Sequence, residues 1–578
     1  MSQHNLLSTQ LQALLAPVYS LSETEFTDLC EQLLAIMGLN KNAVKNELEQ
    51  HLWDENDVFL ITYGDSINHP HKPSLQCLEQ FMHKYVDHFT GVHILPFYPY
   101  SSDDGFAVID YTSVNESLGN WNHISRFAQA YRLMADLVIN HGSSRSIWFE
   151  QFCNGVEPGS YMFYQGNPAD DLSKVVRPRT SPLLRKVDTL NGEKHLWCTF
   201  SHDQIDFNFE DPRVFVQFIK IIAFYLEKGI RIFRLDAVAF LWKEVGTDCL
   251  NLPQTHQLIK VIRLLIEQVA PNAIIISETN LPNEQNLSYF GNSNEAHSIY
   301  NFSLPPLLLH TLTTGNSQAL TRWLMALPPC VAGNCYLNFI ASHDGIGLRP
   351  VEGLLSAQQI QNLVQHALDC NGQVSFRKVD QQQQKPYELN IALFDAMSRM
   401  QSQSKDSLQI SRFIAAHVVM LSIEGIPAFY LHSLLATQND INRFENSGHK
   451  RHINRRRYLV DEIESALGDK NNHQHKVFTE LNQIIKIRQQ QKAFHPNATQ
   501  FTLQLGSKFI GLWRQSLDKK QSIFCVINIS CETALFSLAE LNLIDGQNWY
   551  DLLGHDIGQD PFSELRVEPY QCLWITNI

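Results

Sequence analysis

The chain has 578 residues, of which 44% are hydrophobic, and its formal net charge is −14. It is too long for one ordinary domain, it can bury a large core, and its negative charge argues against nucleic acid as the main partner. The sequence holds no run near the roughly 18 apolar residues of a membrane span. It begins without a basic segment leading into an apolar one, and its 11 cysteines form no CxxC pair. We therefore expect a cytoplasmic protein with no secretory signal.

Residues 1–55 are polar and helix-like, and we expect a helical N-terminal extension there. After them, short and nearly continuous apolar runs recur along the chain, as is typical of parallel strands buried on both faces. The expected strands are 58–63, 92–97, one ending at His141, 230–235, 274–276, 298–302, one ending at His343-Asp344, and 428–431. This series predicts a (β/α)₈ TIM barrel of the α/β class.

Two insertions are expected to interrupt the barrel, and a separate domain to follow it. Residues 145–205 contain several prolines and little periodicity, which predicts an inserted loop-rich B subdomain. Residues 346–407 are expected to form a second insertion of loops and helices. Short alternating runs in residues 495–578 predict a C-terminal all-β domain. The barrel itself is then expected to comprise residues 56–144, 206–345 and 408–494.

Four of the apolar runs stop at a histidine or a carboxylate. They end at His141, Asp236, Glu278 and Asp344. A polar residue at the carboxyl end of a barrel strand is typical of an active site. Three carboxylates placed in this way indicate cleavage of a glycosidic bond, two as the reacting pair and one orienting the sugar. A single such residue is as often a buried structural group, but three in register favour a catalytic site.

Several motifs, in order along the chain, carry a family resemblance. The segments 136–141, 234–236, 278 and 343–344 resemble the sequence regions of the α-amylase-type glycoside hydrolase clan, glycoside hydrolase family 13. Further segments resemble one branch, the sucrose phosphorylases and their relatives. They are 91–97, 104–106, 234–238, 243–247, 302–310, 342–347 and 453–455. The N-terminal extension and residues 53–58 look like those of glucosylglycerate and glucosylglycerol phosphorylases.

The resemblance implies a role for each carboxylate. Asp236 would be the nucleophile that forms a covalent β-glucosyl-enzyme, and Glu278 would be the general acid and then the general base. Asp344 would bind sugar hydroxyls and stabilise the transition state. A retaining mechanism of this kind needs two carboxyls about 5–5.5 Å apart, one ionised and one protonated. Arg234 lies two residues before Asp236 on the same strand face, so we expect it to keep that carboxylate ionised.

The resemblance also implies contacts to the sugar and to phosphate. The expected sugar-binding residues are Asp103, Phe106, His141, His343 and Arg455. Within the basic run 450–457 only Arg455 matches the family motif, and its neighbours are expected at the surface. Arg179 and Tyr387 match the arginine and loop tyrosine that bind phosphate in the branch. An arginine suits phosphate because its planar guanidinium can bind two phosphate oxygens at once. The alternative for Arg179 is a surface salt bridge.

The acceptor loop departs from sucrose phosphorylase, which has Asp and Gln where this chain has Lys385 and Glu388. A lysine favours a carboxylate such as glycerate, whereas a glutamate favours the hydroxyls of glycerol. We expect 2-O-α-glucosylglycerol as the glucoside, and glucosylglycerate next. The alternatives are a sucrose or sucrose 6′-phosphate phosphorylase, an α-glucosidase or transglucosylase of the clan, and a catalytically dead barrel that serves as a scaffold.

No metal site is expected. Asn140 falls where amylases of the clan have a calcium ligand, but the phosphorylase branch resembles metal-free enzymes. The sequence holds no phosphate-cradling glycine loop, so we expect no cofactor and only inorganic phosphate as co-substrate. The expected partners are small molecules, with no membrane, and the expected assembly is a monomer or homodimer.

Overall fold

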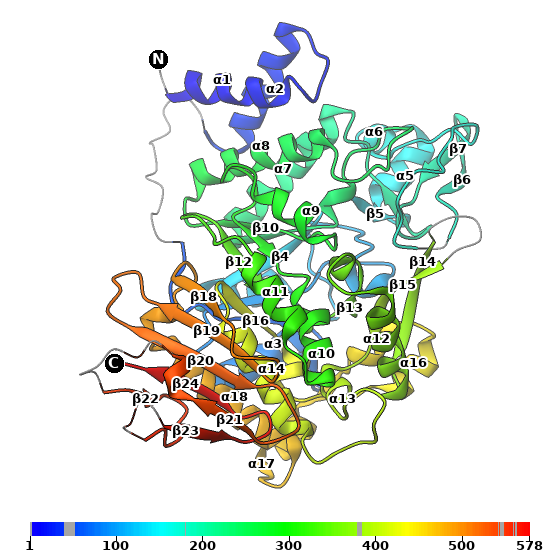
Figure 1. Cartoon of the computed structure of the whole chain (residues 1–578). Coiled ribbons are helices and arrows are strands. Elements are labelled where there is room, and N and C mark those ends of the chain that lie inside the picture. The colour runs from blue at the N-terminus through cyan, green and yellow to red at the C-terminus, as the bar shows by residue number, and fades with distance from the viewer. Residues whose placement is uncertain are drawn as a thin grey trace.

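A closed barrel of eight parallel strands forms the centre of the computed structural model (Figure 1). The structure describes residues 3–39, 52–179, 181–378, 384–541, 543, 548–558, 560 and 563–578. The barrel strands are β1 (Phe59–Thr62), β3 (Gly91–Ile94), β4 (Arg132–Val138), β9 (Ile232–Asp236), β10 (Ile274–Ser277), β11 (Ser298–Tyr300), β12 (Cys335–Asn338) and β16 (Ile426–Tyr430). The predicted (β/α)₈ fold is confirmed.

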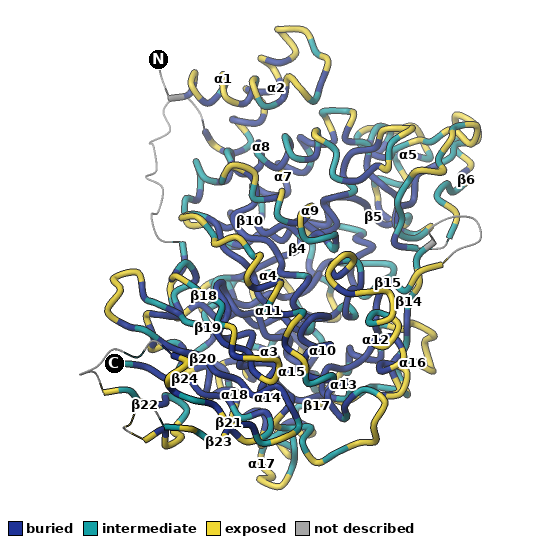
Figure 2. Tube along the Cα trace, viewed as in Figure 1, coloured by how far each residue is buried: buried dark blue, intermediate teal, exposed yellow. Residues whose placement is uncertain are grey.

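The barrel strands are almost wholly buried because helices cover their outer faces (Figure 2). The larger covering helices are α3 (Ser74–Tyr85), α4 (Trp121–Ala130), α7 (Pro212–Glu227), α8 (Pro253–Val269), α10 (Leu304–Thr314), α14 (Gln409–Ser422) and α18 (His473–Gln489). Helix α7 shows how the sequence sets such an element. Asp211 caps its first turn by accepting from the Arg213 N–H, and Pro212 occupies the first turn, where no donor is lost.

Several strands end earlier than predicted, and the differences at β4 and β12 concern the site. Strand β4 ends at Val138, not at His141, and β12 ends at Asn338, well before His343. The barrel ladder stops at these points because the chain leaves the barrel. His141 already belongs to β5 (His141–Ser143), which pairs with β8 (Gln204–Asp206) of the insertion. His141 and His343 therefore lie beyond the ends of the barrel strands.

The insertion between β4 and β9 holds short elements around one hairpin. They are β5, α5 (Ile147–Asn154), α6 (Gly159–Met162), β6 (Leu184–Thr189), β7 (Gly192–Trp197) and β8. The insertion between β12 and β16 forms a sheet in the order β13-β15-β14 beside α12. Its main elements are β13 (Ile346–Gly347), α12 (Ala357–Asp369), β14 (Gln373–Lys378), β15 (Gln384–Asn390) and α13 (Leu393–Ala396).

The described part of the C-terminal region is all-β, as predicted, apart from one short 3₁₀ turn. Its five-stranded and two-stranded sheets contain β18 (Thr499–Leu503), β19 (Phe509–Gln515), β20 (Ser522–Asn528), β21 (Ala534–Ser537), β22 (Tyr550–Asp551), β23 (Glu564–Val567) and β24 (Cys572–Thr576). They pack at the opposite end of the molecule from the N-terminal helices (Figure 1).

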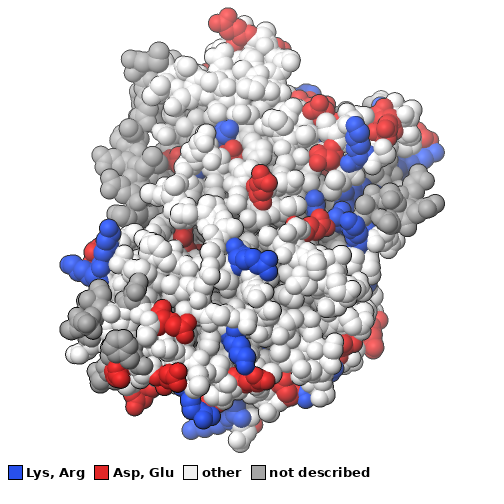
Figure 3. Space-filling model, viewed as in Figure 1, with Lys and Arg blue, Asp and Glu red and all other residues white. Residues whose placement is uncertain are grey.

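Two helices make up most of the described N-terminal residues. Helix α1 (Gln3–Leu15) contacts α8, and α2 (Glu23–Ile36) contacts α7. Residues 1–2 and 40–51 of the predicted extension lie outside the described residues. Acidic and basic side chains are interspersed over the face of the molecule that Figure 3 shows. No described helix is long and apolar enough to span a bilayer.

Candidate active site

A pocket opens at the carboxyl ends of the barrel strands. It gathers side chains from loops that are far apart in the sequence. Of the predicted site residues, it is lined by Asp103, Phe106, His141, Arg179, Asp236, Glu278, His343, Asp344 and Tyr387. The structure therefore brings together the predicted catalytic carboxylates, the predicted phosphate ligands and most of the predicted sugar contacts.

Asp236 is the last residue of β9, and the chain turns sharply after it. Ala237 takes a left-handed conformation with φ of 51°, which is uncommon for a residue with a side chain. Backbone strain of this kind occurs at functional sites, where the surroundings hold it in place. The turn aims the Ala237 N–H at Glu278, which accepts it through Oε2 at 2.9 Å. The strained turn thus fixes both carboxylates relative to each other.

Strand register places Asp236 and Glu278 side by side. Strands β9 and β10 are parallel neighbours in which Leu235 lies opposite Ser277, so the next residues are Asp236 and Glu278. The Glu278 N–H also donates to the Leu235 carbonyl at 3.1 Å, which continues the ladder. Because neighbouring strands lie about 4.8 Å apart, the two carboxylates leave the sheet edge from adjacent positions.

Arg234 lies beneath this pair and is almost fully buried. Its Nη1 donates to Asp236 Oδ1 at 2.7 Å and also contacts Asp136 on β4, while Nη2 is 3.9 Å from Glu278 Oε1. Burial acts to raise the pKa of Asp136, but His93 and Arg234 bring that pKa down to about 2. The predicted contact between Arg234 and Asp236 is present, and Asp136 supplies the fixed negative charge that keeps the guanidinium in place.

Burial raises the pKa of both Asp236 and Glu278, and Arg234 opposes the rise in each case. Two close buried carboxylates disfavour double ionisation, so the pair retains a proton. The direct hydrogen bond from Arg234 goes to Asp236, whereas Glu278 stands 3.9 Å away. This asymmetry favours ionised Asp236 beside protonated Glu278.

Asp344 lies on the other side of the pocket, where two arginines approach it. Arg451 Nη1 is 2.6 Å from Asp344 Oδ1, and Arg455 Nη2 is 3.6 Å from the same oxygen. Burial acts to raise the pKa of Asp344, but the charges of Arg451 and Arg455 hold it well below the usual range. Asp344 is therefore a fixed negative charge in the pocket.

Two histidines line the pocket as neutral rings. Burial lowers the pKa of His141 to about 4 and that of His343 well below its usual value. His343 stacks on Phe106, with ring centroids 5.2 Å apart, and His141 Nε2 lies 3.0 Å from the Phe106 carbonyl oxygen. Asp103 has a left-handed backbone and accepts from Gln204 Nε2 at 3.3 Å. These groups form a wall that combines an aromatic surface with hydrogen-bonding edges.

Tyr387 lines the pocket, and Arg179 lies where the pocket opens into a wider outer vestibule. Arg179 lines both spaces, together with Asp103, Gln204 and Arg451. Burial raises the pKa of Tyr387 to about 12, so its hydroxyl stays protonated and can donate to an anion. Gly345 allows the loop after Asp344 to lie against the strand of Tyr387, because a Cβ there would meet the Leu389 carbonyl at 2.4 Å.

Three predicted contacts lie away from the pocket lining. Arg455 is buried behind it, where Nη1 donates to Asp104 at 2.8 Å and Nε donates to the His343 carbonyl at 2.7 Å. Lys385 is exposed on β15. Glu388 is buried, and both of its carboxylate oxygens are bound by Arg451. The structure therefore brings neither Lys385 nor Glu388 to the pocket.

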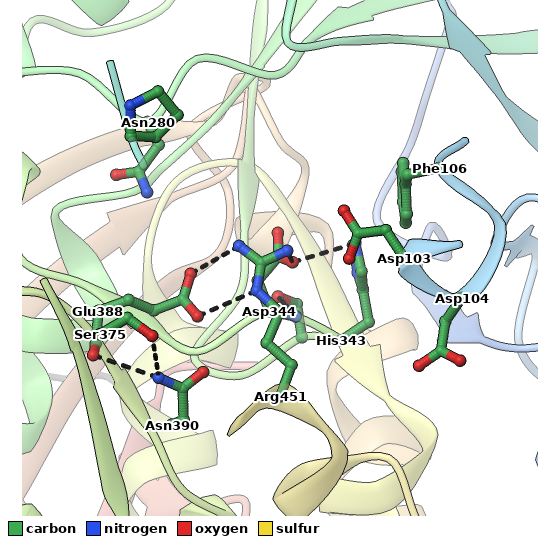
Figure 4. Close-up of polar contacts among 12 residues, drawn as sticks. Asp103, Asp104, Phe106, Asn280, His343, Asp344, Ser375, Glu388, Asn390 and Arg451 are labelled. Atoms are coloured by element: carbon green, nitrogen blue, oxygen red, sulfur yellow. Dashed lines mark hydrogen bonds and ion pairs between the residues drawn. The ribbon is translucent and has the colours of Figure 1, made fainter. Parts of the chain in front are cut away.

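The prediction that the neighbours of Arg455 lie at the surface is wrong for Arg451. Its guanidinium lines the pocket between Asp344 and Glu388 (Figure 4). The 3₁₀ turn Lys450–Asn454 points successive side chains of the basic run in different directions, and sequence spacing alone does not reveal this arrangement. Other pocket residues that the sequence analysis missed are Phe200, Gln204, Ala239, Phe240, Thr279, Asn280 and Leu281. Thr279 and Asn280 directly follow Glu278, so their position in the sequence could have identified them as pocket residues.

A buried lysine binds Asn140, the residue that the sequence analysis compared with a calcium ligand of amylases. Lys243 Nζ donates to Asn140 Oδ1 at 2.7 Å and lies 2.9 Å from Asp206 Oδ2. Asp206 also accepts from the Thr199 hydroxyl and the Asn140 amide. The oxygens of Asn140 and Asp206 already contact the Lys243 ammonium, and this arrangement does not fit a calcium ion.

Comparison with known proteins agrees with this geometry. A family model described as the catalytic domain of alpha amylase matches residues 84–344. The chain is 41% identical to the glucosylglycerate phosphorylase of Allomeiothermus silvanus, over 91% of this chain and 92% of that one. It is 29% identical to the glucosylglycerol phosphorylase of Marinobacter adhaerens, over 76% of this chain and 88% of that one.

Among solved structures, the sucrose 6F-phosphate phosphorylase from Thermoanaerobacter thermosaccharolyticum aligns with a TM-score of 0.71 at 25% identity. The alignment covers 82% of this chain and 94% of that one. The protein belongs to the sucrose phosphorylase branch of the α-amylase-type glycoside hydrolases and is an enzyme, a glucoside phosphorylase.

Proposed function

We propose that this enzyme transfers glucose reversibly from 2-O-α-glucosylglycerate to inorganic phosphate, with retention, and so forms α-glucose 1-phosphate. The observation that carries the proposal is the composition of one pocket. Adjacent strands hold Asp236 and Glu278 over Arg234, and Arg179 lies at the mouth of the same pocket. This set combines a retaining carboxylate pair with a cation suited to phosphate.

In the first step, Asp236 attacks the anomeric carbon of the glucosyl unit. A bond forms between that carbon and the carboxylate oxygen as the bond to the glycerate oxygen breaks. Glu278 gives its proton to the departing oxygen, so glycerate leaves as the free hydroxyacid anion. Asp344 stays ionised beside the sugar, where its charge opposes the positive charge that develops on the ring in the transition state.

In the second step, a phosphate oxygen attacks the anomeric carbon and the bond to Asp236 breaks. Glu278, now ionised, accepts the proton from the incoming phosphate and returns to its starting state. Two inversions at the same carbon give net retention. Arg179 and the protonated Tyr387 hydroxyl bind the phosphate, so that it competes with water for the glucosyl-enzyme.

The choice of glucosylglycerate replaces our expectation of glucosylglycerol. That expectation rested on Glu388 accepting hydrogen bonds from glycerol hydroxyls, but both of its oxygens are bound by Arg451 at 3.0 and 2.7 Å. The relative named for glucosylglycerate is 41% identical, against 29% for the one named for glucosylglycerol. The first observation removes the argument for glycerol, and the second supports the acidic acceptor.

We also propose that catalysis requires no metal and no organic cofactor. Lys243 supplies the positive charge that Asn140 and Asp206 surround, so the insertion and the barrel are joined without a calcium ion. We also propose that the enzyme works in a reducing cytoplasm, where its free cysteines stay reduced.

A panel of donors tests the proposed specificity. Release of glucose 1-phosphate is measured with inorganic phosphate and equal concentrations of glucosylglycerate, glucosylglycerol, sucrose and sucrose 6′-phosphate. We expect kcat/KM for glucosylglycerate to exceed that of every other donor by at least tenfold. A higher value for any other donor contradicts the proposed acceptor.

A further inference from the structure

Arg179 differs from the other arginine that lines the pocket. Among the described residues that line it, Arg179 is the one cation without a carboxylate partner. Its Nη1 donates to the Pro178 carbonyl at 3.4 Å, and its guanidinium carbon lies 5.9 Å from the centroid of the Phe200 ring. Arg451, by contrast, is bound between Glu388 and Asp344.

The position of Arg179 is on the side from which the acceptor enters and leaves. Asp236 and Glu278 line the inner pocket, whereas Arg179 lines both that pocket and the outer vestibule. A group bound to Arg179 therefore lies between the reacting carbon and solvent. This is the space that glycerate vacates and that phosphate then enters.

We propose that Arg179 binds the carboxylate of glycerate in one half-reaction and inorganic phosphate in the other, so that one guanidinium selects both anionic partners of the glucosyl-enzyme. The inference rests on the proposed function, because it requires a double displacement with an acidic acceptor. The two anions occupy the same space at different times, so a single cation is sufficient.

The charges of the pocket support a shared site. Asp103, Asp236 and Asp344 line the pocket, and these carboxylates repel an entering anion. Arg451 is already bound to Asp344 and Glu388, while the predicted acceptor residue Lys385 lies exposed outside the pocket. Arg179 is left to offset the repulsion. Its planar fork matches a carboxylate and a phosphate equally well, since each presents two oxygens at similar spacing.

The test uses a donor whose leaving group does not need Arg179. It compares how well different acceptors capture the glucosyl-enzyme. α-Glucosyl fluoride gives the glucosyl-enzyme by loss of fluoride, and the intermediate then partitions among acceptors in one mixture. D-Glycerate and glycerol are supplied together in one series, and phosphate and glycerol in another. Product ratios are independent of the overall rate, so a partly active variant remains informative.

We expect Arg179→Gln to lower both the glycerate-to-glycerol and the phosphate-to-glycerol product ratio at least tenfold. Arg179→Lys, which keeps the positive charge, is expected to retain most of each ratio. Arg185→Gln is the matched control, because Arg185 lies in the same insertion on β6 and is not part of the pocket lining. Its ratios should equal those of the unmodified enzyme.

Two results overturn the inference. If Arg179→Gln lowers only the phosphate ratio, the carboxylate is bound elsewhere; if neither ratio falls, Arg179 selects neither anion. Failure of the proposed function is recognised separately in the unmodified enzyme. It appears there as release of free glucose with no transfer to glycerate or phosphate.

Discussion

Arg451 donates from Nε and Nη2 to the two carboxylate oxygens of Glu388, at 3.0 and 2.7 Å (Figure 4). The same guanidinium reaches Asp344 through Nη1 at 2.6 Å. Glu388 on β15 therefore orients the arginine that holds Asp344 ionised. Strand β15 is in this way connected directly to a carboxylate that lines the pocket.

Replacing Arg451 should change the pH dependence of turnover. The pKa of Asp344 lies below its usual range, so the carboxylate is ionised at ordinary pH and becomes protonated only as the pH falls through that low value. Arg451→Gln removes the nearest cation and raises this pKa. The acid limb of kcat/KM should move to higher pH, and the effect should be measurable in the range from pH 4 to 7.

Arg457→Gln is the control for this variant, because Arg457 is half exposed and pairs with Asp65 outside the pocket. Its acid limb should match that of the unmodified enzyme. An unchanged acid limb in Arg451→Gln contradicts the role of the arginine. Arg451→Gln should also unfold at a lower denaturant concentration, because it leaves the buried carboxylate of Glu388 without its cation. Removing one partner of a buried pair costs about 3–5 kcal/mol.

Asp236→Asn should abolish turnover while the fold persists. The amide cannot form the covalent intermediate, and loss of a nucleophile typically lowers kcat by at least about 10⁴-fold. Release of glucose 1-phosphate is measured beside the circular dichroism spectrum. Activity above one hundredth of the original in a folded variant would show that another group attacks the sugar.

The barrel strands could be predicted because they are short apolar runs that lack the periodicity of an amphipathic helix. Arg234 and Asp236 were predictable as a contact, since residues two apart on a strand share a face. The ends of β4 and β12 were predicted too far along the chain, because the apolar pattern continues after the backbone has left the sheet.

Arg451 was missed because its role depends on contacts with residues distant in the sequence. Nothing in the basic run 450–457 distinguishes it from Arg456 or Arg457, which lie at the surface. Its two partners come from the loop after β12 and from β15, and only the folded chain brings them together. Likewise, the burial of Glu388 could not be read from its position next to Tyr387.

Tyr387→Phe should weaken phosphate binding without a comparable loss for the glucosyl donor. The hydroxyl remains protonated at working pH because burial raises its pKa to about 12, so the phenol is a donor and not a second anion. A hydrogen bond to a charged group contributes about 1.5–3 kcal/mol, so the KM for phosphate should rise by about tenfold or more. Equal KM values in variant and parent would remove Tyr387 from the phosphate site.

Lys243→Met should destabilise the enzyme, because it leaves Asp206 buried beside Asn140 without its cation. The expected loss is about 3–5 kcal/mol in the free energy of unfolding. Thermal unfolding with and without EDTA checks this prediction together with the proposed independence from metals. EDTA should leave the melting temperature of the unmodified enzyme unchanged, and a fall would show that a bound metal stabilises it.

The most direct test of the account is the product formed from glucosylglycerate with and without inorganic phosphate, followed by nuclear magnetic resonance. We predict that turnover requires phosphate and gives one α-glucose 1-phosphate for each glycerate released. The β anomer would contradict the double displacement through Asp236. Free glucose formed at the same rate with or without phosphate would contradict the phosphorylase mechanism itself.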